Sequence, residues 1–311
     1  MNNYILIGEY LVNIILCSLI FANKYKEQKQ IHYELEKTKN YLKAYIKKGS
    51  IVKPEYRILN EKEKQILAEV LLKLKKENKD LFIFSKKIIL TTKKSSIRNL
   101  GNNFQTLKIN KKNKNKLIMI IKNDGTQGNY NPKRNEINTY NDKKTTLNHE
   151  LLHAASSNPF FSSIGFNRIF KENKENNLRY NEIGRGLNEG YTELLNNRIS
   201  KEKSYSYIHL NKIAYLIELL FENKNEMKDY YFNNDIEGII YELNKYINKE
   251  EIINLLIDID ELYYNKNLLL YYKIKKRILK IYKQNKTKEE IKKFKKEYYQ
   301  NQLIKIMKKT L

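Results

Sequence analysis

Residues 145–157 read TTLNHELLHAASS, and this stretch decides both the local fold and the kind of site that the sequence predicts. His149 and His153 are four residues apart, so on a helix both imidazoles project from one face and can reach one metal ion. Glu150 follows the first histidine, where its carboxylate can take a proton from a water on that metal. The chain has only 4 histidines, so a chance match to this pattern is on the order of one in a few hundred. The stretch therefore predicts a metal-binding helix.

A zinc site of this kind needs a third protein ligand and leaves a fourth position for water. The segment 184–199, GRGLNEGYTELLNNRI, stands out because two glycines lead into a helical stripe of apolar residues. Glu189 and Glu193 are four residues apart on that helix and share one face. The acidic candidates downstream of the motif are Glu172, Glu175, Glu182, Glu189 and Glu193.

The pair of motifs HELLH and NEGYTE resembles the gluzincin group of zinc metallopeptidases, the thermolysin-like zincins, over roughly residues 130–198. In that group two helices face each other, and the second helix has an Asn-Glu-x-x-x-Asp motif. The resemblance implies Zn²⁺ as the cofactor, with His149, His153 and Glu189 as its ligands and Glu150 as the general base. The implied activity is that of a zinc-dependent endopeptidase, which hydrolyses peptide bonds of a peptide or protein substrate with a zinc-activated water.

The sequence departs from that family at Glu193, which stands where the family has an Asp that hydrogen-bonds a ligand histidine. Glu193 and Glu182 are the rivals for the third ligand position. A group that stabilises the oxyanion is also implied, since zincins often use a tyrosine or a histidine for this purpose. The candidates are Tyr180, Tyr191 and His209.

The apolar runs predict an α+β fold: a zincin-like catalytic domain with a mixed sheet over residues 50–200, and a mostly helical region over 201–311. A helix is expected from about Asn60 to Asn78. Short strands should follow it at LFIF (81–84), KIILTT (87–92), FQTLKI, KLIMIIK and 136–140. The resemblance implies an edge strand at 135–141, which an extended peptide can join. The residues between the two motifs predict a hairpin or flap.

The apolar run from Tyr4 to Ala22 is long enough, as a helix, to cross a membrane, and we expect an uncleaved single-pass anchor there. Glu9 and Asn13 interrupt the run, so a helix docked on the protein itself is the alternative. Lysines after the run favour a cytoplasmic location for the rest of the chain. Residues 23–48 predict a helical stalk whose thin apolar stripe can pack on the catalytic domain or on a second copy of the chain, and we expect packing on the domain.

The formal net charge of +25 raises the question of an anionic partner. The excess is nearly all lysine, and lysine, asparagine, isoleucine and tyrosine share A/T-rich codons, so a compositional bias explains it without nucleic acid. The competing hypothesis is a non-catalytic, lysine-rich helical protein that binds nucleic acid or an anionic membrane surface. Cys17 is the only cysteine, which excludes an intrachain disulfide and a cysteine-based metal site. The sequence does not indicate an oligomeric state.

Overall fold

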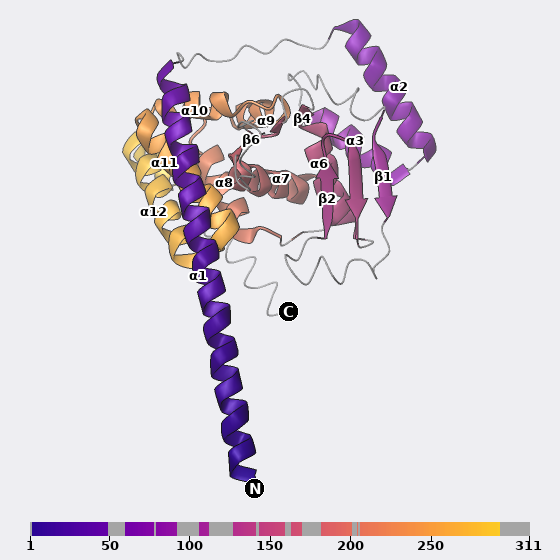
Figure 1. The fold of residues 1–311 in the computed structure, drawn as a ribbon. Helices are drawn as coiled ribbons and strands as arrows, with labels where there is room; N and C mark the ends of the chain where they lie inside the picture. Colours follow the sequence, from indigo (N-terminus) through magenta and orange to yellow (C-terminus); the bar gives the residue numbers. More distant parts are fainter. Residues whose placement is uncertain are drawn as a thin grey trace.

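Helices dominate the chain, and two small sheets complete an α+β architecture (Figure 1). The structure is a computed structural model that describes residues 2–48, 60–77, 79–91, 106–111, 127–140, 143–158, 163–169, 182–200, 204 and 206–292. Its helices are α1 (Asn2–Lys48), α2 (Glu61–Glu77), α3 (Lys79–Thr91), α6 (Lys144–Ala155), α7 (Arg185–Ile199), α8 (Ile208–Glu218), α9 (Lys224–Phe232), α10 (Ile236–Asn244), α11 (Lys249–Asn265) and α12 (Leu268–Asn285). Its strands are β1 (Lys108–Lys111), β2 (Gly128–Asn131), β3 (Glu136–Thr139), β4 (Ser157–Asn158), β5 (Ser163–Ile164), β6 (Asn167–Ile169) and β7 (Glu182–Ile183).

The first sheet is mixed and has the order β1-β3-β2. Strand β1 runs parallel to β3, and β2 runs antiparallel to it, with Tyr130 opposite the fully buried Ile137. The predicted strand at 136–140 therefore exists as β3, but the prediction that it lies at the edge is wrong, because it has a partner on both sides. Among the described strands, β2 is the one at the edge of the sheet beside α6 (Figure 1).

The second sheet is an antiparallel meander, β4-β5-β6-β7, that leads the chain from α6 to α7. Its β5–β6 hairpin turns at Gly165, whose φ of +53° lies in the left-handed region that favours glycine. The hairpin agrees with the prediction for the segment between the two motifs. Residues 170–181 lie outside the described part of the chain, and with them the rest of the predicted flap.

The predicted strands at 81–84 and 87–92 are wrong, because residues 79–91 form helix α3. Phe84 and Ile88 are buried and lie one helical turn apart, so the segment buries one stripe of a helix. Helix α3 packs on α2, whose bounds agree with the predicted helix from Asn60 to Asn78. The run KLIMIIK lies outside the described residues.

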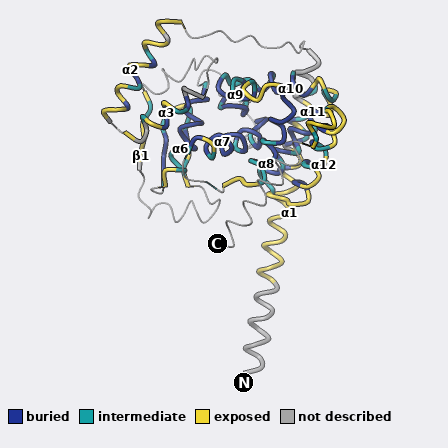
Figure 2. The backbone as a smooth tube through the Cα atoms, turned by 180° about the vertical axis from the view of Figure 1, so that it is seen from behind, coloured by how far each residue is buried: buried dark blue, intermediate teal, exposed yellow. Residues whose placement is uncertain are grey.

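Helices α6 and α7 lie in contact near the centre of the molecule, where the backbone is mostly buried (Figure 2). Helix α7 begins after Gly184, which has a φ of +79° and no room for a Cβ, since one would lie 2.3 Å from the backbone oxygen of Phe166. Asp260 of α11 accepts hydrogen bonds from the backbone N–H groups of Gly184 and Gly186, at 2.8 and 2.7 Å. A side chain from another helix thus satisfies N–H groups at the start of α7.

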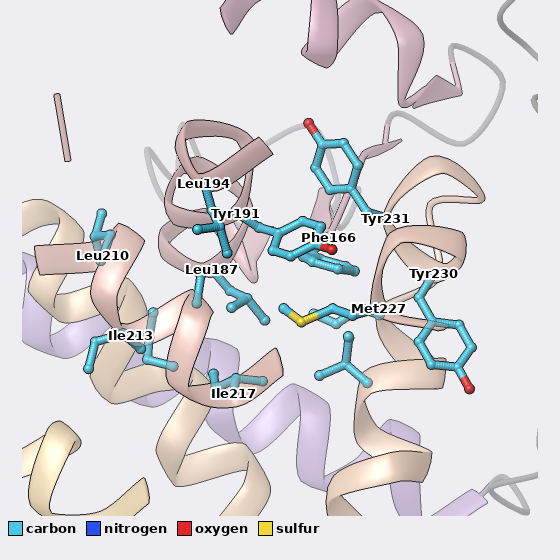
Figure 3. Packing of buried hydrophobic residues seen from close by; sticks show 14 of the residues in the cluster. Phe166, Leu187, Tyr191, Leu194, Leu210, Ile213, Ile217, Met227, Tyr230 and Tyr231 are labelled. Carbon is cyan, nitrogen blue, oxygen red and sulfur yellow. The ribbon is translucent and has the colours of Figure 1, made fainter. Parts of the chain in front are cut away.

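As the periodicity predicts, the described part of the C-terminal region is mostly helical and includes helices α8 to α12. Residues 293–311 of the predicted region lie outside the described part of the chain. Asparagine or aspartate side chains cap the last four helices, where they accept hydrogen bonds from backbone N–H groups of the first turn; they are Asn223, Asp235, Asn248 and Asn267. The core that these helices share with α7 includes Leu187, Ile213, Met227 and Tyr230, which pack together in Figure 3.

Helix α1 packs its C-terminal half on α11 and projects from the molecule at its N-terminal half (Figure 1). Ile31 and Leu35 are buried, and Lys43 pairs with Glu250 of α11 at 2.7 Å. The stripe predicted for residues 23–48 therefore packs on the protein itself, but on α11 of the C-terminal region and not on the predicted catalytic domain.

Among the residues that the structure describes, none of the helices combines the length and the apolar character that crossing a bilayer requires. The predicted single-pass anchor over residues 4–22 is therefore wrong, and so is the membrane localisation with a cytoplasmic catalytic domain. Glu9 and Asn13 interrupt the apolar run of the sequence, and such polar groups are costly to place in hydrocarbon.

Candidate metal centre

Three side chains from two helices meet at one point. His149 and His153 come from successive turns of α6, and Glu189 comes from the facing turn of α7. The Nε2 atoms of the two histidines lie 3.1 Å apart. The Oε2 atom of Glu189 lies 3.2 Å from Nε2 of His149 and 3.4 Å from Nε2 of His153. The sequence prediction placed these three residues together, and the structure brings them together.

The triangle of donor atoms fits a zinc ion. Zinc bonds to histidine nitrogen and carboxylate oxygen are about 2.0–2.1 Å, so the edge of a regular tetrahedron of such ligands is about 3.3 Å. The three observed edges of 3.1, 3.2 and 3.4 Å match three corners of that tetrahedron. Two imidazoles and one carboxylate are also a donor set that zinc accepts, with the fourth corner left for another ligand.

Glu193 orients the first histidine. Its Oε2 lies 3.2 Å from Nδ1 of His149, one turn further along α7 than Glu189. A carboxylate there accepts a hydrogen bond from Nδ1–H, which leaves Nε2 with its lone pair toward the ligand triangle. Although the family pattern has an Asp at this position, the longer Glu193 side chain reaches the histidine and is itself buried.

Asn188 is a contact of the second histidine that the sequence analysis did not single out. Its side-chain amide nitrogen lies 3.4 Å from Nδ1 of His153, and its Oδ1 accepts a hydrogen bond from the backbone N–H of Phe166 at 3.1 Å. The motif helix, α7 and the β5–β6 hairpin are therefore joined at this residue. Its position directly before Glu189 in the NEGYTE segment was the available signal.

Glu150 is buried beside the triangle and under strand β2. A backbone hydrogen bond from Tyr130 of β2 reaches its carboxylate. The strand can approach this closely because residue 128 is glycine: a Cβ there would lie 2.8 Å from Cγ2 of Thr146 and 3.2 Å from Cγ of Glu150. The side chain of Glu150 on α6 thus lies against the edge strand β2.

Burial and the neighbouring charges raise the pKa values of His149 and Glu150 and lower that of Glu189. Burial lowers the pKa of His149, but hydrogen bonds to Glu189 and Glu193 outweigh burial and raise that pKa to about 10. Burial raises the pKa of Glu189, yet the two histidines outweigh it and hold the pKa well below its usual range. Burial raises the pKa of Glu150, which the histidines oppose only in part. Without metal, His149 therefore keeps a proton that a cation would have to displace.

The rival for the third ligand position, Glu182, lies in a different cluster. It accepts hydrogen bonds from Tyr264 at 2.6 Å, Arg185 at 2.7 Å and Asn167 at 2.9 Å. The other rival, Glu193, contacts the outer nitrogen of His149. Neither belongs to the ligand triangle.

Of the predicted oxyanion candidates, the two that the structure describes do not lie at the triangle. Tyr191 is fully buried in the core against Phe166 and donates to Glu218 at 3.2 Å (Figure 3). The ring of His209 packs on that of Tyr271, with 4.6 Å between their centroids. Tyr180 lies outside the residues that the structure describes.

Tyr207 stands at the site instead. Its ring centroid lies 5.9 Å from that of His149, and the negative charge of Glu189, followed by burial, raises its pKa. Its backbone has a φ of +51°, a left-handed conformation that is uncommon for tyrosine and sets the direction of the side chain before α8 begins. The sequence contained no signal that separates Tyr207 from the other tyrosines among the 25 in the chain.

No protein-family model, no curated protein and no solved structure matches this chain.

Proposed function

We propose that this chain is a zinc-dependent peptidase of the gluzincin type, in which α6 and α7 are the two facing helices of the active site. The observation that supports the proposal most strongly is the triangle of His149, His153 and Glu189, whose edges of 3.1, 3.2 and 3.4 Å suit one zinc ion. Glu193 behind His149 and Glu150 beside the triangle support it further, since each stands where the reaction needs its chemistry.

Zinc, when bound, would supply a Lewis acid that polarises the scissile carbonyl and acidifies a water. Glu150 would accept the proton of that water, and would then deliver it to the leaving amine. Its buried position favours this role, because burial raises the pKa of the carboxyl toward the working range of a general base. Glu193 would hold the His149 ring in the orientation that presents Nε2.

Tyr207 is our candidate for stabilising the oxyanion. Its side chain is 38 % exposed, and the pKa of its hydroxyl is raised, so the group keeps its proton at neutral pH and can donate it in a hydrogen bond. A donor aimed at the carbonyl oxygen as negative charge develops there lowers the barrier of acyl transfer.

The position of β2 supports an extended peptide as the substrate. Among the described strands it lies at the sheet edge beside α6, and its Tyr130 contacts the general base candidate Glu150. An extended peptide that pairs with such an edge would lie along the strand with its backbone near this carboxylate.

The test is cleavage of an unbiased peptide library by the zinc-loaded full chain, read by mass spectrometry. Glu150→Gln should keep its zinc and lose about 10²- to 10⁴-fold in rate, because it removes the base but no ligand. Glu61→Gln is the control, since that side chain is 89 % exposed on α2. Unchanged cleavage by Glu150→Gln, or no cleavage by the zinc-loaded wild type, would contradict the proposal. Salt-sensitive DNA binding without zinc would favour the lysine-rich binding protein instead.

A further inference from the structure

A row of aromatic and cationic side chains leads away from the ligand His149. The ring centroid of Tyr207 lies 5.9 Å from that of His149 and 5.9 Å from that of Tyr263. The guanidinium of Arg185 lies over the ring of Tyr263, 5.0 Å from its centroid. We call Tyr207, Tyr263 and Arg185 the outer row. The three residues come from the α7–α8 connection, α11 and α7, so the row is assembled by the tertiary fold.

Arg185 lies close to the metal centre along α7. It is the first residue of that helix and precedes Glu189 by four residues, so the two side chains share a face. The negative charge of Glu189 contributes to the raised pKa of Arg185, along with the larger effect of Glu182 and against that of burial. The side chain of Arg185 is 38 % exposed, so part of it is open to solvent.

The hydrogen-bonding capacity of Arg185 is only partly used within the protein. A guanidinium has five N–H donors. One of its terminal nitrogens bonds Glu182 at 2.7 Å and the hydroxyl of Tyr263 accepts a second hydrogen bond, while Nε is buried without a hydrogen-bond partner among the described residues. Glu182 also accepts from Tyr264 and Asn167, so it is a well-satisfied carboxylate that does not take up the whole guanidinium. An arginine that served only to neutralise Glu182 would more typically pair through both of its terminal nitrogens.

The distances suit a substrate that lies across the metal centre. One turn of α-helix rises about 5.4 Å, and an extended peptide advances about 3.4 Å per residue. A group held by Arg185 would therefore stand one or two residues from a bond cleaved beside Glu189. The contacts with Glu182 and Tyr263 restrict the orientation of the guanidinium, which prepares it for a planar carboxylate.

We propose that Arg185 is a specificity-determining residue that binds a carboxylate of the substrate within one or two residues of the scissile bond. The proposal rests on the proposed peptidase function and names its substrate class: peptides with an acidic side chain, or with the free C-terminal carboxylate, at that distance. Both sources present the same planar anion to the guanidinium.

The experiment compares matched peptides on the full zinc-loaded chain. One arm replaces Glu by Gln at each of two positions on either side of the cleaved bond, and the other replaces a free C-terminus by an amide. The wild type should prefer the carboxylate at one position or at the C-terminus by about 10- to 100-fold in kcat/KM. Arg185→Gln should reduce that ratio to near one at unchanged zinc content, and Arg277→Gln, a matched loss of charge on α12, should leave it intact. The arm that shows the preference identifies the source of the carboxylate.

A wild type without a preference in either arm would overturn the proposal, and so would an Arg185→Gln variant that keeps the preference. Binding of the same peptides to zinc-loaded Glu150→Gln, measured by fluorescence anisotropy, makes the test independent of turnover. If the wild type cleaves nothing but carboxylate peptides bind about 10- to 100-fold more tightly in an Arg185-dependent manner, the peptidase function fails and the carboxylate site stands. If peptides are cleaved but the two forms bind equally, only the carboxylate site fails.

Discussion

Helix α12 buries six side chains, all of them aliphatic or aromatic, along one face, whereas α6 buries seven consecutive residues that include His149, Glu150 and His153. Burial of apolar side chains stabilises the fold in proportion to the area removed from water. Burial of ionisable groups costs free energy that their mutual contacts only partly offset. Helix α12 therefore contributes mainly to the stability of the protein, whereas the buried ionisable groups of α6 and α7 lower stability and, under the proposed function, serve metal binding.

A core truncation in α12 tests the first side of this comparison. Ile274 is fully buried, so Ile274→Ala should lower the free energy of unfolding by about 2–5 kcal/mol. Leu269, on the same helix, is 80 % exposed, and Leu269→Ala should change it by less than about 0.5 kcal/mol. Urea unfolding measures both. The folded fraction of each variant should still bind zinc. A loss of zinc from folded Ile274→Ala would contradict the separation of roles between α12, in stability, and α6, in metal binding.

Removing the hydroxyl of Tyr207 tests the proposed function of the site formed by α6 and α7. Tyr207→Phe should lower kcat by about 10²- to 10³-fold, because it removes a hydrogen bond that forms as charge develops on the carbonyl oxygen. Zinc content and urea unfolding should stay as in the wild type. Tyr272→Phe, on an exposed tyrosine of α12, serves as the control. A Tyr207→Phe enzyme with normal kcat would exclude this residue from catalysis.

Two buried glutamates, Glu193 of α7 and Glu242 of α10, allow a direct comparison of a residue at the site with one away from it. Glu193→Gln should weaken zinc binding by about 10- to 100-fold, because it alters the group that orients His149. Glu242 of α10 is equally buried, with 1 % exposure for each, and contacts Tyr230 and Lys245 instead. Glu242→Gln should leave the zinc dissociation constant unchanged while lowering the free energy of unfolding. Equal effects of the two substitutions on zinc affinity would mean that Glu193 has no special relation to the metal.

The last prediction concerns the pH dependence of zinc binding. In the metal-free protein, Glu189 and Glu193 outweigh burial and hold the pKa of His149 at about 10. Zinc needs the neutral imidazole, so binding releases this proton at any pH below that value, and the affinity should rise about tenfold per pH unit between pH 6 and 8. Titration with a metal buffer at three pH values measures the slope. The slope should become shallower in Glu193→Gln, and an affinity independent of pH would contradict a protonated His149.

The sequence was sufficient to predict those segments whose residues follow a helical period. The four-residue spacing of His149 and His153, and of Glu189 and Glu193, predicted two helices and the faces that meet. The same rule would have placed Arg185 one turn before Glu189. The periodicity of α8 to α12 likewise predicted a helical C-terminal region.

The sequence was insufficient where tertiary packing decides. The run of residues 79–91 is rich in β-branched and aromatic residues, and its short apolar clusters do not distinguish a strand from a buried helix. Packing on α2 makes it helix α3. Tyr207, between α7 and α8, has a left-handed backbone conformation that directs its side chain to the site. No local sequence pattern predicts this conformation. The apolar run at 4–22 had the length of a membrane span, but length alone was a poor guide.

The most direct test of the central claim is the zinc content of the purified full chain, measured by mass spectrometry after dialysis against a zinc buffer. We expect about one zinc per chain in the wild type. That zinc should be lost in His153→Ala and retained in His209→Ala, since His209 packs on Tyr271 outside the ligand triangle. A wild type without zinc, or a His153→Ala variant with as much zinc as the wild type, would contradict the claim that α6 and α7 form a metal centre.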